Sequence, residues 1–379
     1  MTPFSLLGGL SAEEFLADYW QKKPLLVRQA IPGFTGLLDA DELAGLACED
    51  SALSRLVVEK IGPEGSRWQL RQGPVGARDF RKLPDSHWSL LVQEVNHFLP
   101  EAWDLLMRFA FIPFARLEDL MVSYAAPQGS VGAHFDSYDV FLLQGQGRRE
   151  WRISAQTDLT LIEDAPLKLL KNFQAEHSWV LEPGDMLYLP PRIAHHGIAQ
   201  DACMTYSIGF RAPSRAELLG GFLDYLHEQL QPEGLYSDPD LALQAHPAEL
   251  SEFTLDRSRT MLDALRWDEA MFEDFLGRFL TEPRPHVLFD PPAKPLNLST
   301  FAKALESSGH IELALPSRLL YRGQRFFMNG EAVAISPADA GSFTSLANQR
   351  RLALPARLDR ESIDILHAWH RAGFIMLSD

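Results

Sequence analysis

The pattern of apolar and polar residues changes character along the chain, and its first region mixes short helices with short strands. A capping-box sequence at Ser11–Glu14 precedes apolar residues at helical spacing, which predicts an amphipathic helix ended by Lys23-Pro24. Further helices are predicted at 41–48, 88–98 and 102–108, with Pro100 closing the second, and strands at 25–27, 56–59 and 68–71. The aromatic residues here are most simply core residues.

From Leu120 onward the pattern predicts strands. Short apolar or alternating runs, separated by Gly, Pro and Asp, cover 120–125, 134–136, 140–144, 150–153, 179–181, 186–189 and 204–210. Many short strands with such breaks indicate a β-sandwich or barrel. We expect the sheets to close into a double-sheet jelly roll, which removes the sheet edges and leaves a mouth for a ligand.

The last part of the chain is first helical and then mixed. A second capping box, Ser214–Glu217, begins a helix, and helices are also predicted at 247–265 and 268–280. Their apolar stripes can pair within the chain or across a two-fold axis, and a homodimer is our hypothesis. After a Pro-rich linker at 283–295, helices at 299–307 and 360–371, strands at 311–315, 319–322, 325–328 and 374–377, and a hairpin turn at Asn329-Gly330 predict a winged-helix-like fold. The predicted domains are 1–212, 213–285 and 286–379.

Composition narrows the function classes. The chain has 379 residues but only two cysteines, Cys48 and Cys203, which excludes a cysteine-based zinc site and fits the reducing cytoplasm. We expect no signal peptide and no membrane span. The net charge of −16 argues against binding a phosphate backbone. It fits a basic partner, but on charge alone it is explained as well by solubility. The acidic charge is concentrated in residues 213–290, with 16 Asp and Glu against 6 Lys and Arg, whereas 291–379 are nearly balanced. We therefore expect protein contacts rather than DNA binding from the last domain.

The candidate chemistry centres on two short motifs. His134 and Asp136 are two residues apart, so in a strand their side chains point to one face. His195 follows the rigid Pro190-Pro191 pair and offers a third ligand. Two histidines and a carboxylate with open positions are typical of non-haem Fe(II) oxygenases. His196 is the alternative third ligand; we prefer His195.

The motif Gly184-Asp185-x4-Pro190-x4-His195, preceded by His-x-Asp, resembles the double-stranded β-helix (cupin) oxygenases, and specifically the Jumonji-C (JmjC) group. Segments 139–151 and 206–213, together with 19–24 and 88–93, resemble the bacterial ribosomal oxygenases, and the resemblance covers nearly the full length. The resemblance implies a JmjC domain, a helical dimerisation segment and a winged-helix end. It also implies Fe(II)- and 2-oxoglutarate-dependent hydroxylation, with O2, of an arginine in the sixteenth (L-series) protein of the large ribosomal subunit.

The resemblance assigns roles to residues. His134, Asp136 and His195 would hold Fe(II), and Arg149, which shares strand parity with Trp151, would pair with the distal carboxylate of 2-oxoglutarate. Thr205 stands where members of the family carry asparagine, and its hydroxyl would hydrogen-bond the cosubstrate. Tyr138 shares parity with Asp136 and would line the substrate mouth.

Three other functions stay open at this point. The same chemistry could serve histidine hydroxylation or demethylation of another protein. The jelly roll could be a non-catalytic binding scaffold, although all the ligand types are intact. Residues 291–379 could make the chain a DNA-binding regulator.

Overall fold

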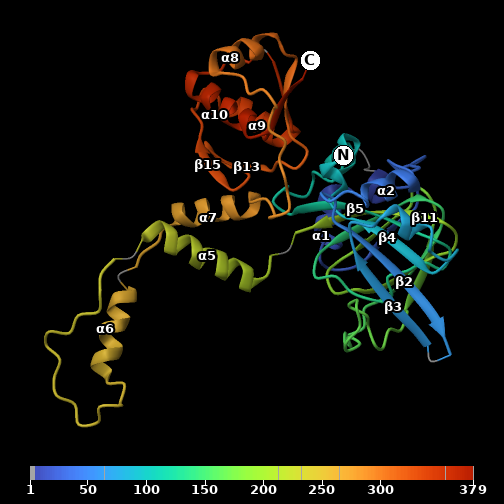
Figure 1. Cartoon of the computed structure of the whole chain (residues 1–379), viewed down its shortest axis with the longest axis horizontal. Coiled ribbons are helices and arrows are strands. Elements are labelled where there is room, and N and C mark those ends of the chain that lie inside the picture. Colours follow the sequence, from blue (N-terminus) through green and yellow to red (C-terminus); the bar gives the residue numbers. More distant parts are fainter. Residues whose placement is uncertain are drawn as a thin grey trace. The chain divides into compact units, whose positions relative to one another are not determined.

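The computed structural model describes residues 5–63, 65–211, 213–231, 233–263, 265–354 and 356–378 (Figure 1). The predicted boundary at residue 212, and Ala264 within the predicted helix 247–265, lie outside these ranges. The chain forms two compact units. The first contains residues 1–212, 285–290 and 314–316, and the second contains 213–284, 291–313 and 317–379. Among the described residues, no helix is long and apolar enough to cross a membrane.

Two antiparallel sheets form the first unit. The larger sheet has the strand order β1-β9-β6-β11-β5-β4-β2-β3, and the smaller has the order β10-β7-β8. The strands are β1 (Leu25–Val27), β2 (Ser54–Gly62), β3 (Gly65–Gln72), β4 (Trp88–Val92), β5 (Leu117–Ala125), β6 (Val140–Gln146), β7 (Arg149–Ser154), β8 (His177–Leu181), β9 (Met186–Leu189), β10 (Ala194–Ala199) and β11 (Cys203–Phe210). The helical elements are η1 (Ser5–Leu7), α1 (Ala12–Asp18), α2 (Ala40–Leu46), α3 (Ala77–Phe80), η2 (Val95–His97) and α4 (Pro100–Met107).

Strand β11 lies in the middle of the large sheet and is buried along its whole length. It pairs with β5 on one side and β6 on the other, so that Thr205 lies opposite both Ser123 and Gln144. One face of this sheet packs against the N-terminal helices. There, Phe15 of α1 meets the ring of Tyr188 with centroids 5.0 Å apart and that of Phe141 with centroids 5.6 Å apart. The opposite face is left to form the site.

The predicted closure of the sheets is wrong. The two sheets remain separate and open, and β1 and β3 end the larger one. Charged side chains occur along the exposed edge strand β3, including Arg67 and Arg71, and such charges disfavour pairing with another chain. The double-stranded β-helix is therefore a sandwich with free edges rather than a closed barrel.

The predicted helix at 88–98 is also wrong. Residues Trp88–Val92 form β4, paired with β2 and β5, and a 3-10 turn follows. A short apolar run is compatible with either a buried strand or a buried helix, and here the pairing partners decide. Pro100 opens α4 instead of ending a helix, since proline suits the first helical position. The first helix ends at Asp18, well before Lys23-Pro24.

The predicted strand at 134–136 is reduced to a single bridge between His134 and His195. His195 lies in strand β10, as its second residue, and not in a loop. Pro190-Pro191 and Arg192, whose φ of 69° is left-handed, form the turn that leads into β10. The two histidines are therefore fixed by main-chain pairing between distant segments.

The second unit has its own core, around Phe301, Phe326, Phe343 and Trp369. Its elements are α5 (Arg215–Leu230), α6 (Glu252–Asp263), α7 (Glu269–Thr281), α8 (Leu298–Ser307), β12 (His310–Leu313), β13 (Leu319–Arg322), β14 (Arg325–Met328), β15 (Glu331–Ala334), α9 (Ala340–Gln349), β16 (Arg351–Ala353), α10 (Arg360–Arg371) and β17 (Ile375–Ser378). The Asn329-Gly330 hairpin is confirmed, with positive φ at both residues. Its second strand, β15, together with α9 and β16, had not been predicted.

Candidate active site

Main-chain hydrogen bonds hold His134 and His195 side by side. The His134 N–H donates to the His195 carbonyl at 2.9 Å, and the His195 N–H donates back to the His134 carbonyl at 2.8 Å. Each ring has its Nδ1 atom 2.9 Å from a carbonyl oxygen, of Gly132 for His134 and of Ile193 for His195. If Nδ1–H donates in both rings, both Nε2 atoms are free to act as ligands.

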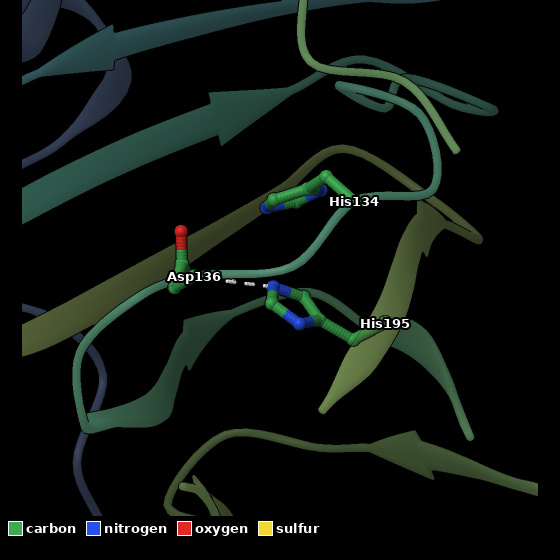
Figure 2. A group of neighbouring side chains, drawn as sticks. All are labelled: His134, Asp136 and His195. Carbon is green, nitrogen blue, oxygen red and sulfur yellow. Dashed lines mark ion pairs between the residues drawn. The ribbon is translucent and has the colours of Figure 1, made fainter. Parts of the chain in front are cut away.

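Asp136 completes a group of three side chains that converge on one space (Figure 2). One ligand atom from each of His134, Asp136 and His195 lies within 4.8 Å of the others. Asp136 Oδ2 lies 3.6 Å from His195 Nε2. The N–H of Arg192 donates to the carbonyl of Asp136 at 2.8 Å, so the proline turn also fixes the third residue. Two imidazoles and a carboxylate on one side of a point suit an octahedral Fe(II) with open positions.

Burial keeps the His195 imidazole neutral. Burial and the neighbouring His134 lower the pKa of His195 to about 4, although the Asp136 carboxylate acts in the opposite direction. A neutral imidazole has a free lone pair for a metal, so His195 is in its ligating form near neutral pH.

His196 lies outside this cluster. Adjacent residues of a strand point to opposite faces, and the ring of His196 packs edge-on against Phe173, with centroids 6.1 Å apart. His195 itself is only 2% exposed. The structure therefore brings together the three residues preferred from the sequence and leaves His196 on the other face of β10.

A cavity of about 390 Å3 adjoins the cluster. Strands β2, β4, β5 and β11 form its floor, and the loop after β7 contributes Pro166, Leu167 and Lys168. His134, Asp136 and His195 lie in its wall, and Arg149 lines it as well. The cavity is large enough for a small ligand, and its lining combines apolar side chains with many polar and charged ones.

Arg149 is a buried cation without an anion. It is 3% exposed, and no carboxylate in the described part of the chain forms an ion pair with it. Its Nη1 atom donates to the hydroxyls of Ser123 at 3.2 Å and Thr205 at 3.3 Å, while its buried Nε has no hydrogen-bond partner among the described residues. Burial lowers the pKa of Arg149. Burying a charge costs free energy unless the charge is paired, so this guanidinium is suited to binding an anionic ligand.

Thr205 positions Arg149. The Thr205 hydroxyl accepts from Arg149 and donates to Gln144 Oε1 at 3.1 Å, so the side chain connects the guanidinium to β6. Ser123 shares this task but had not been predicted from the sequence. The available signal was strand parity, since Asp119, Met121 and Ser123 alternate along β5 and all line the cavity.

Trp151 lies between the metal-ligand cluster and the cation. Its ring centroid is 5.9 Å from that of His195 and 5.2 Å from Arg149 Cζ. Gly197 lies opposite Trp151 in the register of β10 and β7. A Cβ atom on Gly197 would lie 2.7 Å from the Trp151 ring and 3.0 Å from Arg149 Nε, so the absence of a side chain creates room for both groups. Tyr138, 41% exposed, also lines the cavity, as do Asp119 and Arg55.

Two family models and a curated relative match the chain. Residues 104–218 match the family model of the JmjC domain, and residues 264–376 match that of the ROXA-like winged helix. The chain is 37% identical, over 326 residues, to the "Ribosomal protein uL16 3-hydroxylase" of Escherichia coli K12, a match that covers 86% of each protein. The chain belongs to the JmjC ribosomal oxygenases.

Other ribosomal oxygenases extend the comparison. A "Probable ribosomal oxygenase" of Haemophilus influenzae is 38% identical over 256 residues, which cover 66% of this chain and 58% of that protein. The solved structure of E. coli YcfD, a ribosomal oxygenase, in complex with cobalt and 2-oxoglutarate superimposes with a TM-score of 0.84 at 33% identity and covers 98% of this chain and 99% of that one. Fold class and family membership predicted from the sequence are thus confirmed.

Proposed function

We propose that this protein is an Fe(II)- and 2-oxoglutarate-dependent dioxygenase that hydroxylates an arginine side chain of the large-subunit ribosomal protein uL16, the sixteenth of the L series. The observation that carries the proposal is the combination, in one cavity, of a two-histidine, one-carboxylate cluster and a buried, unpaired arginine. The donor set suits Fe(II), and Arg149 suits a dicarboxylate. The likeness to the E. coli uL16 3-hydroxylase supports the substrate.

The residues divide the work as follows. His134, Asp136 and His195 would hold the metal, Arg149 would pair with the distal carboxylate of 2-oxoglutarate, and Thr205 would keep Arg149 in place. Once bound, metal and cosubstrate supply the oxidation, in which O2 converts 2-oxoglutarate to succinate and CO2 and a substrate C–H becomes C–OH. The cavity walls orient the substrate and exclude water.

The cavity has a place for a cationic side chain. Asp119, which is mostly buried, lines the cavity floor two residues from Met121 on the same face of β5. A carboxylate there complements a guanidinium. The net charge of −16 would also attract a basic ribosomal protein.

Mass spectrometry tests the function. The purified protein, with Fe(II), 2-oxoglutarate and uL16 from the same organism, should add 16 Da to one arginine and form an equal amount of succinate. The Asp136→Ala variant should do neither. Modification of a histidine, or loss of a methyl group, would replace arginine hydroxylation with one of the other JmjC reactions. Absence of 2-oxoglutarate turnover would favour the alternative that the protein is a non-catalytic binding scaffold.

The assembly and location are proposed on other grounds. Large apolar side chains are exposed on the helical segment, with Leu219 and Leu223 on α5, Leu262 on α6 and Trp267 before α7. Covering them in a homodimer would remove this surface from water. Light scattering that gives a monomer at micromolar concentration would reject the dimer. We place the protein in the cytoplasm, with its substrate, and expect no DNA binding from residues 286–379.

A further inference from the structure

Arg55 is a second arginine in the cavity, and the proposed reaction assigns it no role. It lies on β2 and faces the cavity with Val57. In the register of the sheet, Arg55 lies opposite Leu91, Leu91 lies opposite Ser123, and Ser123 lies opposite Thr205. Arg55 therefore occupies the same cross-strand row as the two hydroxyl residues that hold Arg149.

The guanidinium of Arg55 is poorly satisfied by the protein. Its Nε atom is buried and has no hydrogen-bond partner in the described part of the chain. Its Nη2 atom donates to the sulfur of Met121 at 3.7 Å, and a thioether is a weak acceptor. Among the described residues, no carboxylate forms an ion pair with it. A partly enclosed cation with so few acceptors has N–H groups that can donate hydrogen bonds to the oxygen atoms of a bound ligand.

Arg55 and Arg149 contact different residues of β5. The guanidinium of Arg55 reaches across β4 to Met121, whereas that of Arg149 hydrogen-bonds to Ser123. Arg149 is held at Ser123, and a five-carbon dicarboxylate bound between the metal and Arg149 is already fixed at both ends. Arg55 lies instead beside Met121, adjacent to Asp119 on the same face of β5. This is the part of the cavity left for the protein substrate.

We infer that Arg55 is a substrate-positioning residue that donates hydrogen bonds to main-chain carbonyl oxygens of the uL16 segment next to the hydroxylated arginine. The inference rests on the proposed function. A basic substrate segment offers carbonyl oxygens rather than carboxylates as its regular acceptors, and the planar guanidinium fork can bind one or two of them. Asp119 would receive the cationic side chain, and Arg55 would fix the backbone that carries it.

The first experiment compares three variants of the full-length enzyme on a uL16 peptide. Arg55→Met keeps the length of the side chain and removes its donors, and Arg55→Lys keeps the charge without the fork. Arg71→Met is the matched control, because Arg71 lies on the neighbouring strand and pairs with Asp79 outside the cavity. We expect the peptide KM to rise about 10- to 100-fold in Arg55→Met and less in Arg55→Lys, and to stay within about twofold in Arg71→Met.

A second readout separates positioning from general damage. The dissociation constant of 2-oxoglutarate, measured with Co(II)-loaded protein and no peptide, should be the same in wild type and Arg55→Met. Peptides in which single amide carbonyls around the arginine are reduced to methylene should identify the acceptor. Removing the recognised carbonyl should weaken peptide binding to the wild type about tenfold and leave peptide binding to Arg55→Met unchanged. The reason is that the two changes remove the same interaction.

The outcomes are distinguishable. An unchanged peptide KM in Arg55→Met, or equal losses in both proteins at every carbonyl, overturns the role of Arg55 while the proposed function stands. A parallel loss of 2-oxoglutarate binding would show that the change damages the site as a whole, and also overturns it. If wild type fails to oxidise uL16 although it binds Co(II) and 2-oxoglutarate, the proposed substrate is wrong and the inference falls with it.

Discussion

Gly197 and Trp151 face each other across β10 and β7, and a methyl group on Gly197 would reach to 2.7 Å from the Trp151 ring. The same methyl would lie 3.0 Å from Arg149 Nε. Trp151 is buried beside His195, so its ring has little freedom to move away. This one glycine therefore lets Arg149 and His195 lie on either side of the Trp151 ring.

The Gly197→Ala variant should lose cosubstrate binding before it loses metal binding. The added methyl pushes the Trp151 ring and Arg149 out of place, and we expect the 2-oxoglutarate KM to rise at least about tenfold, a loss of about 1.4 kcal/mol. Steady-state kinetics and Co(II) titration measure the two effects. Gly45→Ala is the control, because a Cβ there meets nothing within 4 Å. Equal 2-oxoglutarate KM values in the two variants would contradict this account.

Replacing Arg149 should separate function from stability. In Arg149→Met we expect 2-oxoglutarate binding to be lost, because the dicarboxylate no longer has a cation. The free energy of unfolding of the cosubstrate-free protein should rise by about 1 kcal/mol, because a buried unpaired charge is removed. Calorimetric titration and urea unfolding measure the two quantities. A marked loss of stability would show that the charge is already satisfied in the free protein.

The hydroxyl of Thr205 should matter through Arg149. Thr205→Val removes the group that bridges Arg149 and Gln144 while keeping its shape, so we expect the 2-oxoglutarate KM to rise about fivefold, or about 1 kcal/mol. Thr205→Ser restores the hydroxyl and should behave as wild type. Equal effects of valine and serine would point to packing instead. The peptide KM should not change in either variant.

The Asp136→Ala variant should show near-complete loss of both Fe(II) and turnover, since two neutral imidazoles remain in the cluster. Metal analysis and succinate release measure these effects. Asp201→Ala is a suitable comparison, because Asp201 pairs with Arg148 at the surface. Retention of stoichiometric iron in Asp136→Ala would remove Asp136 from the ligand set.

Stability of the metal-free protein should fall in mild acid. The pKa of His195 is about 4 in the folded protein and about 6.5 when unfolded, so the unfolded chain binds more protons between these values and stability is lost as the pH falls through that window. From pH 7 to pH 5 the contribution of His195 amounts to roughly 2 kcal/mol. Urea unfolding in a chelator at both pH values should show a smaller loss in His195→Gln. Identical losses in both proteins would exclude His195 as the source.

The sequence was most informative where local chemistry determines structure. The capping boxes at Ser11 and Ser214 and the Asn329-Gly330 turn form as predicted, because each depends on residues close in sequence. Residues 88–92 are predicted as helical but form a strand. Their conformation is determined by pairing with β2 and β5, which lie far away in the chain. The openness of the sheets likewise depends on the tertiary arrangement.

The site shows the same division. His134, Asp136 and His195 could be proposed from spacing and resemblance, and Arg149 from the resemblance supported by its parity with Trp151. The structure brings all four to one cavity. Gly197 and Arg55 gave no such signal, because each acts through a partner on another strand, and Ser123 could have been found only from its parity along β5. The pairing between His134 and His195 could not be predicted from the sequence either. In place of the predicted strand at 134–136, the structure has a single bridge between these two residues.

That bridge has a consequence for the life of the enzyme. Because His134 and His195 hydrogen-bond to each other through the main chain, the positions of both imidazoles are set by the polypeptide itself. When a bound metal ion dissociates or is removed by a chelator, the two imidazoles should stay in position to bind another ion. Inactivation by metal loss should therefore be repaired by simple resupply of iron, within the time of mixing and without refolding.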